Sequence, residues 1–382
     1  MSYMTKAISF VENPLYKELP YSKRNWGHPW HSLCSYHGKI KPAIASILIK
    51  EFTKKGDVIL DPLCGVGTIP FEAALNGRYA IGNDLSELAY NVTFAKLCPP
   101  KKSDIDRRLK TLEDIVNYNI DKIENVDIGF GLNGKIEDYF QEKTLREIII
   151  IREYYKNLNS IDNVDAFIFS CFAHVLHGNR PYALSRNSHP LTPYYPSGPY
   201  IYKNVIEHIS NKVNLSFKNL EKLDQEYKIN FIQGTAYNLD YNKLINIIPN
   251  KSVDAIITSP PFSNSIKFYS QNWLRLWLAG WEKEDFHNIN NEFLEIRQKN
   301  DLGVYKSFFE IGFKLLKPEG KMILHLGKSS KSDMGSELSK LCSPWFNVIY
   351  LGNESVSTLE KHGIKDKGGT SNHQYLFLQK NQ

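Results

Sequence analysis

A rigid polar turn follows the apolar run at 253–257 and presents groups that could hold an amino group. The turn reads Thr258-Ser259-Pro260-Pro261-Phe262. Two consecutive prolines fix φ at about −65° and remove two backbone donors, so the neighbouring carbonyl groups are left as unshared acceptors. Ser259 adds a hydroxyl oxygen, and Phe262 adds a flat apolar ring. Acceptors beside an aromatic plane suit an aminated base, although a Pro-Pro pair after a strand is also common in simple turns.

A glycine loop forms the second stretch whose residue types could do chemistry. It reads Asp61-Pro62-Leu63-Cys64-Gly65-Val66-Gly67-Thr68 and lies between a strand predicted at 57–60 and an apolar helix. Gly65 and Gly67 allow the backbone to approach a ligand closely, and the first turn of the helix offers unpaired amide groups. The pattern predicts a site for a nucleotide-type cofactor.

Residues around this loop indicate which cofactor it would bind. A second strand, predicted at 79–82, is followed by Asp84 and Leu85, where a carboxylate can accept hydrogen bonds from ribose hydroxyls. A dinucleotide-binding loop needs a third glycine where Pro70 stands. Asp61 would repel a pyrophosphate but could hold the positive amino group of a methionine moiety. We therefore expect S-adenosylmethionine (SAM) rather than NAD.

Together, the two stretches resemble the cofactor loop and catalytic tetrapeptide of the amino-methylating, site-specific DNA methyltransferases. Ser-Pro-Pro-Phe in that family usually accompanies methylation of the 4-amino group of cytosine, whereas Asp or Asn in first place usually accompanies the 6-amino group of adenine. The resemblance implies a class I SAM-dependent methyltransferase with a mostly parallel, seven-stranded, Rossmann-like sheet and a helical insertion. It covers residues 40–98 and 229–330 well. The residues it implies are Ser259, Pro260, Pro261 and Phe262 for catalysis, and Asp61, Pro62, Cys64, Gly65, Gly67, Thr68, Asp84 and Leu85 for the cofactor.

The same resemblance implies two further cofactor contacts. The segment just before the glycine loop lies near the methionine end of the cofactor in the family, which points to His37 and Lys39. The third strand is predicted at 229–233, and the turn after it would place Thr235 and Ala236 beside the adenine ring. An acid often follows that turn in the family, and this chain lacks it.

We divide the chain into an N-terminal arm and helix (1–55), a cofactor-binding half (56–98), a helical insertion (99–228) and a catalytic half with the C-terminal strands (229–382). The insertion contains a long loop rich in proline, aromatic and polar residues, which is uncommon without a functional role. Two arginines there could pair with phosphates or a guanine edge, and two tyrosines could stack on bases. The loop is either the DNA-contacting segment or a cap over the cofactor cleft. The candidate contacts are Arg180, Arg186, Tyr194 and Tyr195.

Composition limits the class of protein further. The 382 residues carry a formal net charge of +6, which is compatible with a polyanionic partner without requiring one. Five scattered cysteines form no Cys-x-x-Cys pair, and the histidines lack a recognised ligand spacing, so we expect no metal and no disulfide framework. No signal core or membrane segment is apparent, so we expect a cytoplasmic protein.

The expected reaction is direct methyl transfer from SAM to a cytosine amino group in double-stranded DNA, with the target base flipped out of the duplex. A restriction endonuclease of the same system is an expected partner. Three alternatives remain open: methylation of adenine in DNA, methylation of RNA, and a catalytically silent DNA-binding protein that keeps the fold.

Overall fold

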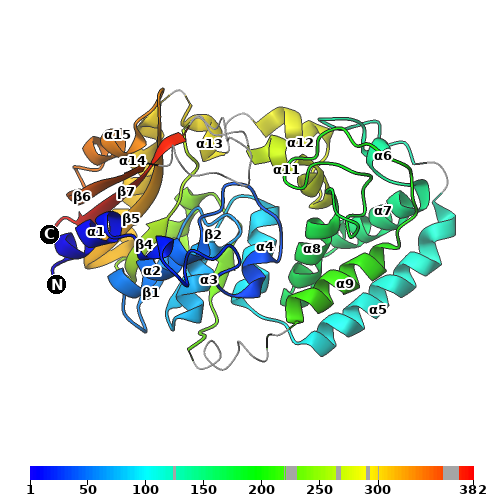
Figure 1. The fold of residues 1–382 in the computed structure, drawn as a ribbon, viewed down its shortest axis with the longest axis horizontal. Coiled ribbons are helices and arrows are strands. Elements are labelled where there is room, and N and C mark those ends of the chain that lie inside the picture. Colours follow the sequence, from blue (N-terminus) through cyan, green and yellow to red (C-terminus); the bar gives the residue numbers. More distant parts are fainter. Residues whose placement is uncertain are drawn as a thin grey trace.

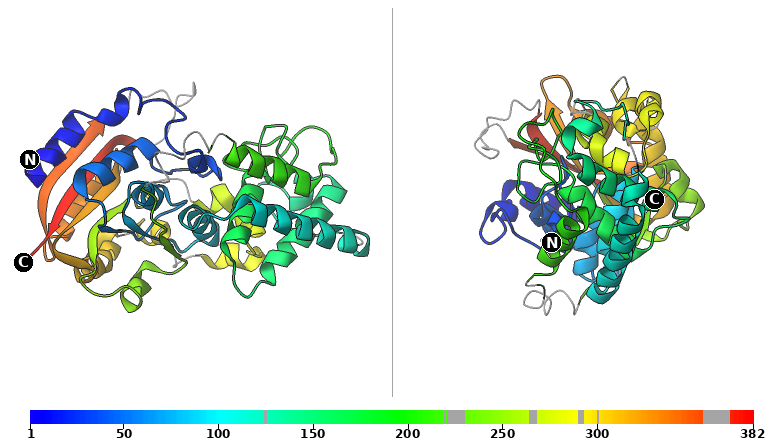
Figure 2. Two further views of the ribbon diagram at one scale, coloured as in Figure 1. Left: turned by 90° about the horizontal axis from the view of Figure 1, so that it is seen from below. Right: turned by 90° about the vertical axis from the view of Figure 1, so that its right-hand side faces the viewer.

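The protein consists of a part built on a β-sheet and a part built from helices. A computed structural model describes residues 1–123, 126–218, 220, 230–263, 268–289, 293–299, 301–355 and 370–382. The sheet part and the helical part lie side by side along the long axis of the molecule (Figures 1 and 2). No helix of the described ranges is both long and apolar enough to cross a membrane.

The sheet has seven strands in the order β3-β2-β1-β4-β5-β7-β6. Neighbours from β3 to β5 pair in parallel, and β7 runs antiparallel between β5 and β6. This order is that of the class I SAM-dependent methyltransferase fold, so the predicted fold class is confirmed. The strands are β1 Val58–Asp61, β2 Tyr79–Asn83, β3 Thr235–Tyr237, β4 Val253–Thr258, β5 Leu316–Ser329, β6 Phe346–Ser355 and β7 Thr370–Lys380.

The central strands bury both of their faces, and alternate residues point to opposite sides. Ile59 and Ile257 pack in one cluster with the first three helices, whereas Leu60 and Ile256 pack in another on the far side. The helices on the first side are α1 Tyr3–Glu12, α2 Pro42–Phe52 and α3 Thr68–Leu75. Those on the second side are η4 Tyr241–Asn246, α14 Tyr305–Leu315 and α15 Met334–Leu341.

The N-terminal segment, predicted to form an arm and a helix over residues 1–55, begins with an additional helix. Ser2 caps α1 by accepting a hydrogen bond from the Thr5 amide at 3.1 Å, and Ala7 and Phe10 face the core. The Phe10 ring meets Tyr375 of β7 edge to face at 5.1 Å. The sequence did not indicate this helix, because it buries only Ala7 and Phe10 and the residues around them are mostly polar.

The helical part contains most of the chain between β2 and β3. Its largest helices share one apolar cluster with α11, which comes from the sequence after β4. Helix boundaries here are α4 Glu87–Leu97, α5 Lys102–Asn119, α6 Ile136–Tyr139, α7 Glu142–Lys156, α8 Asn163–Val175, α9 Val205–Phe217, α11 Phe268–Leu278 and α12 Lys283–Asn288. The short helix α13 Leu294–Arg297 packs instead in the second cluster on the sheet, through Leu294. Single 3₁₀ turns lie at η1 Leu15–Lys17, η2 Pro29–Ser32, η3 Ile120–Lys122 and η6 Leu302–Val304.

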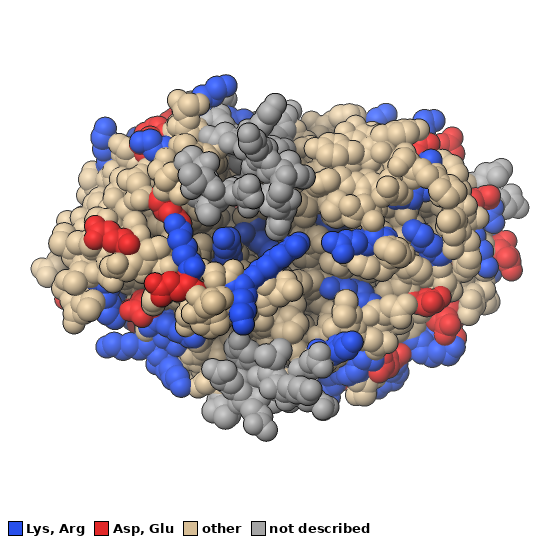
Figure 3. Space-filling model, in the orientation of Figure 1, with Lys and Arg blue, Asp and Glu red and all other residues tan. Residues whose placement is uncertain are grey.

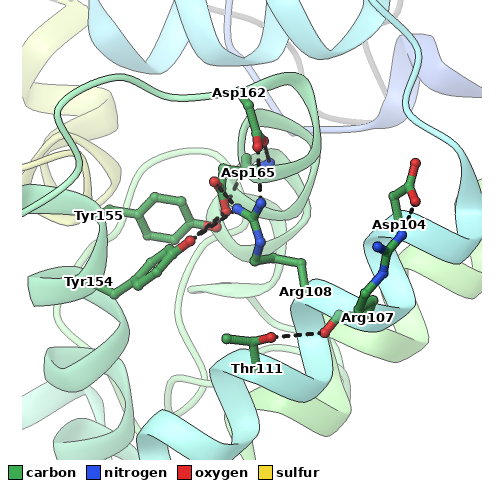
Figure 4. A network of polar contacts seen from close by, with 8 residues as sticks. All are labelled: Asp104, Arg107, Arg108, Thr111, Tyr154, Tyr155, Asp162 and Asp165. Carbon is green, nitrogen blue, oxygen red and sulfur yellow. Dashed lines mark hydrogen bonds and ion pairs between the residues drawn. The ribbon is translucent and has the colours of Figure 1, made fainter.

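A polar network ties three of these helices together (Figure 4). Arg108 of α5 forms ion pairs with Asp165 of α8 and, at 3.0 Å, with Asp162, the N-cap residue of that helix. Tyr154 of α7 donates to Asp165 at 3.1 Å and accepts from Arg108 at 3.0 Å. Because every member of the network has a partner, the network fixes the mutual positions of α5, α7 and α8.

Candidate functional site

The glycine loop connects β1 to α3 and is held in a fixed shape by backbone contacts. Gly65 and Gly67 adopt φ angles of +51° and +68°, a region that favours glycine. The Cys64 amide donates to the Asn83 carbonyl at the end of β2 at 2.9 Å. Gly67 is the N-cap of α3 and supplies no side-chain cap, so the first amide groups of the helix remain available to an anionic group of a ligand.

The loop contains three further predicted cofactor residues, Pro62, Cys64 and Thr68. Pro62 and Cys64 contact neighbouring residues of the protein. The Pro62 carbonyl accepts from the Asn83 side chain at 3.0 Å, and the Cys64 sulfur lies 3.5 Å from the Thr93 hydroxyl. Thr68 Oγ1 is buried and has no hydrogen-bond partner among the residues that the structure describes. A buried hydroxyl in that state fits a site completed by a ligand.

Asp84 organises the loop from the end of β2. Its carboxylate accepts from the Gly65 amide at 2.8 Å and from the Ser86 amide at 3.0 Å. Each oxygen keeps a second lone pair, so ribose hydroxyls remain an acceptable partner. The structure therefore gives Asp84 a role in shaping the loop, and the ribose contact stays a prediction.

Two more carboxylates accompany Asp84 at this edge of the sheet. Burial raises the pKa of Asp61 to about 7 and that of Asp84 to about 6. Glu295 of α13 has a pKa raised to about 7, also by burial, with a smaller contribution from the charge of Asp84. Its carboxylate accepts from the Phe268 amide at 2.9 Å. Buried acids with raised pKa values favour a cationic ligand, and SAM carries positive charge on its sulfonium and amino groups.

Sequence reasoning missed Glu295, and it did not single out Tyr36 among the residues before the loop, so the contacts expected of His37 and Lys39 stay predictions. A Cβ on Gly65 would lie 3.4 Å from the Tyr36 ring, so Tyr36 is the residue that packs on the loop. His37 is exposed, and the Lys39 ammonium donates to the His31 carbonyl at 2.6 Å. No sequence pattern distinguishes Glu295 from other acids of the segment before η6.

The third strand lies further along the chain than predicted. β3 is Thr235–Tyr237, residues 231–234 form no strand, and Ile229 lies outside the described residues. Gly234 therefore comes directly before β3 and not after it. A glycine is needed there because a Cβ would lie 2.6 Å from the Ala80 carbonyl oxygen.

As a consequence, Thr235 and Ala236 lie within the strand and not in a turn after it, and the adenine contacts expected of them stay predictions. These residues pair with Ile81 and Gly82 inside the sheet. Tyr237 pairs with Asn83, and its carbonyl accepts from the Asp84 amide at 3.2 Å, so Asn238 is the next residue beside Asp84. The Asn238 amide donates to the Asp84 and Leu85 carbonyls at 3.0 and 2.9 Å.

The Ser-Pro-Pro-Phe turn follows β4, which lies directly beside β1 in the sheet. Ile59 and Leu60 of β1 pair with Ala255 and Ile256 of β4, so Asp61 and Ser259 emerge at the same edge. In open α/β sheets, ligands bind at this edge where the strand order reverses. The topology thus brings the cofactor loop and the turn together.

Contacts on both sides fix the turn. Ser259 Oγ lies 2.9 Å from His325 Nδ1 of β5, and the Pro261 carbonyl accepts from the Gln298 side chain at 2.9 Å. The Pro260 carbonyl has no hydrogen-bond partner within the described ranges. Phe262 packs so closely on β5 that a Cβ on Gly327 would lie 2.5 Å from its ring. Sequence reasoning missed His325, whose signal in the sequence is an ionisable residue among the apolar residues of β5.

The long loop of the helical part is anchored by hydrogen bonds. The Pro193 carbonyl accepts from Trp273 Nε1 at 3.2 Å and from the Tyr139 hydroxyl at 2.7 Å. Next to it, Tyr194 and Tyr195 are 57% and 66% exposed, so the two rings are presented to solvent by a fixed backbone.

The two candidate arginines of this loop differ in their contacts. Arg180 is exposed, and no bond to its side chain is found among the described residues. Arg186 donates to the Gly198 carbonyl at 2.7 Å and to the Asp138 carbonyl at 2.9 Å, and it lies over the Tyr200 ring. Arg186 therefore supports the loop, which leaves Arg180 as the candidate for phosphate contact.

The described residues contain no group of three or more His, Cys, Asp or Glu side chains that could hold a metal ion.

Comparison with known proteins finds similarity to methyltransferases. Residues 29–128 match the family model of the RMKL-like methyltransferase domain. The Type II methyltransferase M.MjaII of Methanocaldococcus jannaschii is 21% identical over 327 residues, a match that covers 63% of this chain and 61% of that relative. The match thus spans less than two thirds of the relative's length.

Among solved structures, the rRNA methyltransferase aviRa of Streptomyces viridochromogenes aligns over 91% of this chain and 88% of its own, with 8% identity and a TM-score of 0.35. A TehB-like SAM-dependent methyltransferase of Corynebacterium glutamicum aligns over 88% and 87%, with 7% identity and a TM-score of 0.33. The strand order, the glycine loop and the matched domain together identify a SAM-dependent methyltransferase domain of class I fold, and SAM is its cofactor.

Proposed function

We propose that the chain transfers a methyl group from SAM to the exocyclic 4-amino group of a cytosine in DNA. The observation that carries the proposal is the position of Ser259 and Pro260 next to the cofactor loop, at the ends of adjacent parallel strands. Their oxygens are of the type that accepts hydrogen bonds from an amino group. The first residue of the turn favours cytosine over adenine by the resemblance described above.

The turn would act by orienting the amino group. An exocyclic amino nitrogen is a weak nucleophile because its lone pair is delocalised into the ring. Ser259 Oγ and the Pro260 carbonyl would accept its two hydrogens, which favours a pyramidal nitrogen with an available lone pair. Phe262, fixed by its contact with Gly327, would offer its remaining face to the base. SAM supplies the electrophilic methyl group when it is bound.

Surface features support a DNA substrate. Lys and Arg side chains gather across the middle of the face drawn in Figure 3, where the surface is hollowed between the sheet part and the helical part. Positive charge at such a hollow favours phosphates. Exposed Tyr194 and Tyr195 could stack on bases, and Arg180 could pair with a phosphate. A cytoplasmic location and a restriction endonuclease as partner belong to this proposal.

Transfer of tritium-labelled methyl groups from SAM to unmethylated duplex DNA tests the proposal, with RNA as the parallel substrate. We expect label in DNA, and label in RNA alone would contradict a DNA substrate. Ser259→Ala should lower kcat by about 10²-fold or more while SAM binding, measured by calorimetry, stays unchanged. Ser252→Ala, at the opposite end of β4, is the matched control and should keep full activity. Unchanged activity in Ser259→Ala would remove the turn from the mechanism.

A further inference from the structure

Ser259 differs from the acids and amides that could occupy its place because its side-chain oxygen itself carries a hydrogen. A carboxylate or amide oxygen is only an acceptor, whereas a hydroxyl can present either its hydrogen or its lone pairs. If the hydroxyl hydrogen pointed at the substrate, it would meet the hydrogens of the amino group. The site therefore needs a second group that takes this hydrogen.

His325 is the group in position to do so. Its Nδ1 lies 2.9 Å from Ser259 Oγ, at hydrogen-bond distance and on the neighbouring strand β5. The His325 side chain is only 5% exposed, and its ring stacks on Tyr375 at 5.1 Å and meets Phe262 edge to face at 5.4 Å. These contacts fix the ring, so Nδ1 is held facing the serine.

The charge state of His325 follows from its surroundings. Burial holds the pKa of the imidazole well below its ordinary value, and the nearby His373 adds to the shift. The ring is therefore neutral near pH 7, and only one of its nitrogens carries hydrogen. Nε2 is buried and has no hydrogen-bond partner among the described residues. The neutral charge alone does not decide which nitrogen carries the hydrogen. The tautomer is therefore set by the hydrogen bond between Nδ1 and Ser259.

We propose that His325 is a positioning residue for Ser259: its Nδ1 accepts the hydroxyl hydrogen, so that Ser259 Oγ faces the substrate amino group with lone pairs only. The inference rests on the proposed function, because it assigns the orientation of the hydroxyl in that reaction. It also fixes the tautomer of His325 as the one with hydrogen on Nε2. His325 thus acts on the reaction only through Ser259.

A double-mutant cycle tests this dependence. His325→Phe keeps an aromatic ring against Phe262 and Tyr375 but removes both nitrogens, and we expect it to lower kcat about fivefold to tenfold with SAM affinity unchanged, the effect of one hydrogen bond. In the Ser259→Ala background the same change should have no further effect on kcat. His325→Asn, which can restore an acceptor near Nδ1, should recover most of the loss. Tyr375→Phe, which keeps the stacked ring, is the control and should retain full activity. Equal losses from His325→Phe in both backgrounds would overturn the proposal.

A measurement without substrate separates this inference from the proposed function. Nitrogen-15 NMR of histidine-labelled protein, assigned with His325→Asn, reports the tautomer directly. We expect an unprotonated Nδ1 on His325 whose resonance shifts in Ser259→Ala. Hydrogen on Nδ1 would refute the proposal even if DNA methylation is observed. The expected tautomer in a protein that methylates no DNA would instead refute only the proposed substrate.

Discussion

Gly67 packs so tightly in the cofactor loop that its replacement by alanine has a calculable consequence. A Cβ at this position would lie 2.6 Å from Thr93 Oγ1 and 2.8 Å from Thr93 Cγ2, and the residue has a φ of +68°. The backbone conformation costs an L-residue about 1–2 kcal/mol. Overpacking against Thr93 adds about 1–3 kcal/mol. We therefore expect Gly67→Ala to lower the free energy of unfolding by about 2–5 kcal/mol.

Thr93→Ala should remove the second contribution but not the first, because it deletes the two closest atoms and leaves the φ angle unchanged. In that background, Gly67→Ala should cost only about 1–2 kcal/mol, a coupling of about 1–3 kcal/mol. Gly56→Ala is a matched control, since Gly56 has a φ of +85° and open space where a Cβ would be. Urea unfolding of the SAM-free protein measures all of these values. An identical cost of Gly67→Ala with and without Thr93 would refute the packing of α4 against the loop.

Three further predictions concern the cofactor edge and the DNA-contacting loop. Asp84→Ala should weaken SAM binding at least tenfold in a calorimetric titration, because the Gly65 amide loses its acceptor; unchanged affinity would refute its role in the loop. Asp61→Asn should stabilise the SAM-free protein at pH 8 but hardly at pH 4, as thermal unfolding at both pH values would show. The pKa of Asp61 is raised to about 7 in the folded state and is about 3.9 in an unfolded chain, so the wild-type protein loses stability as the pH rises from about 4 to 7 and the loss is complete at pH 8. Arg180→Ala should weaken DNA binding and reduce the slope of the logarithm of the DNA-binding constant against the logarithm of the salt concentration by about one. Arg186→Ala should instead lower the unfolding temperature. Loss of DNA binding in Arg186→Ala together with a lower unfolding temperature in Arg180→Ala would contradict their assignment.

The sequence predicted the sheet wherever the pattern is local. β1, β2 and β4 are short apolar runs that end at turn residues, and each lies within a residue or two of its predicted position. The fold class followed from the glycine loop together with the turn after β4. β6, Phe346–Ser355, was not located because much of it is exposed and its polar residues hide the alternation typical of a strand.

Site residues that act through distant contacts could not be predicted from their own neighbours. His325 and Glu295 reach the site only because β5 and α13 are packed beside it. The residues next to them in the sequence do not indicate that packing. The shift of β3 has the same origin, since Gly234 is required by its close approach to Ala80 of β2. Tyr36 likewise gains its place at the loop from the fold.

Analysis of nucleosides tests the central claim most directly. The purified protein is incubated with SAM and unmethylated duplex DNA, the DNA is digested to nucleosides, and the modified nucleosides are identified by mass spectrometry. We predict 4-N-methyldeoxycytidine from the wild-type protein and its loss in Ser259→Ala. Finding 6-N-methyldeoxyadenosine as the sole product would contradict the assignment of cytosine to the Ser-Pro-Pro-Phe turn.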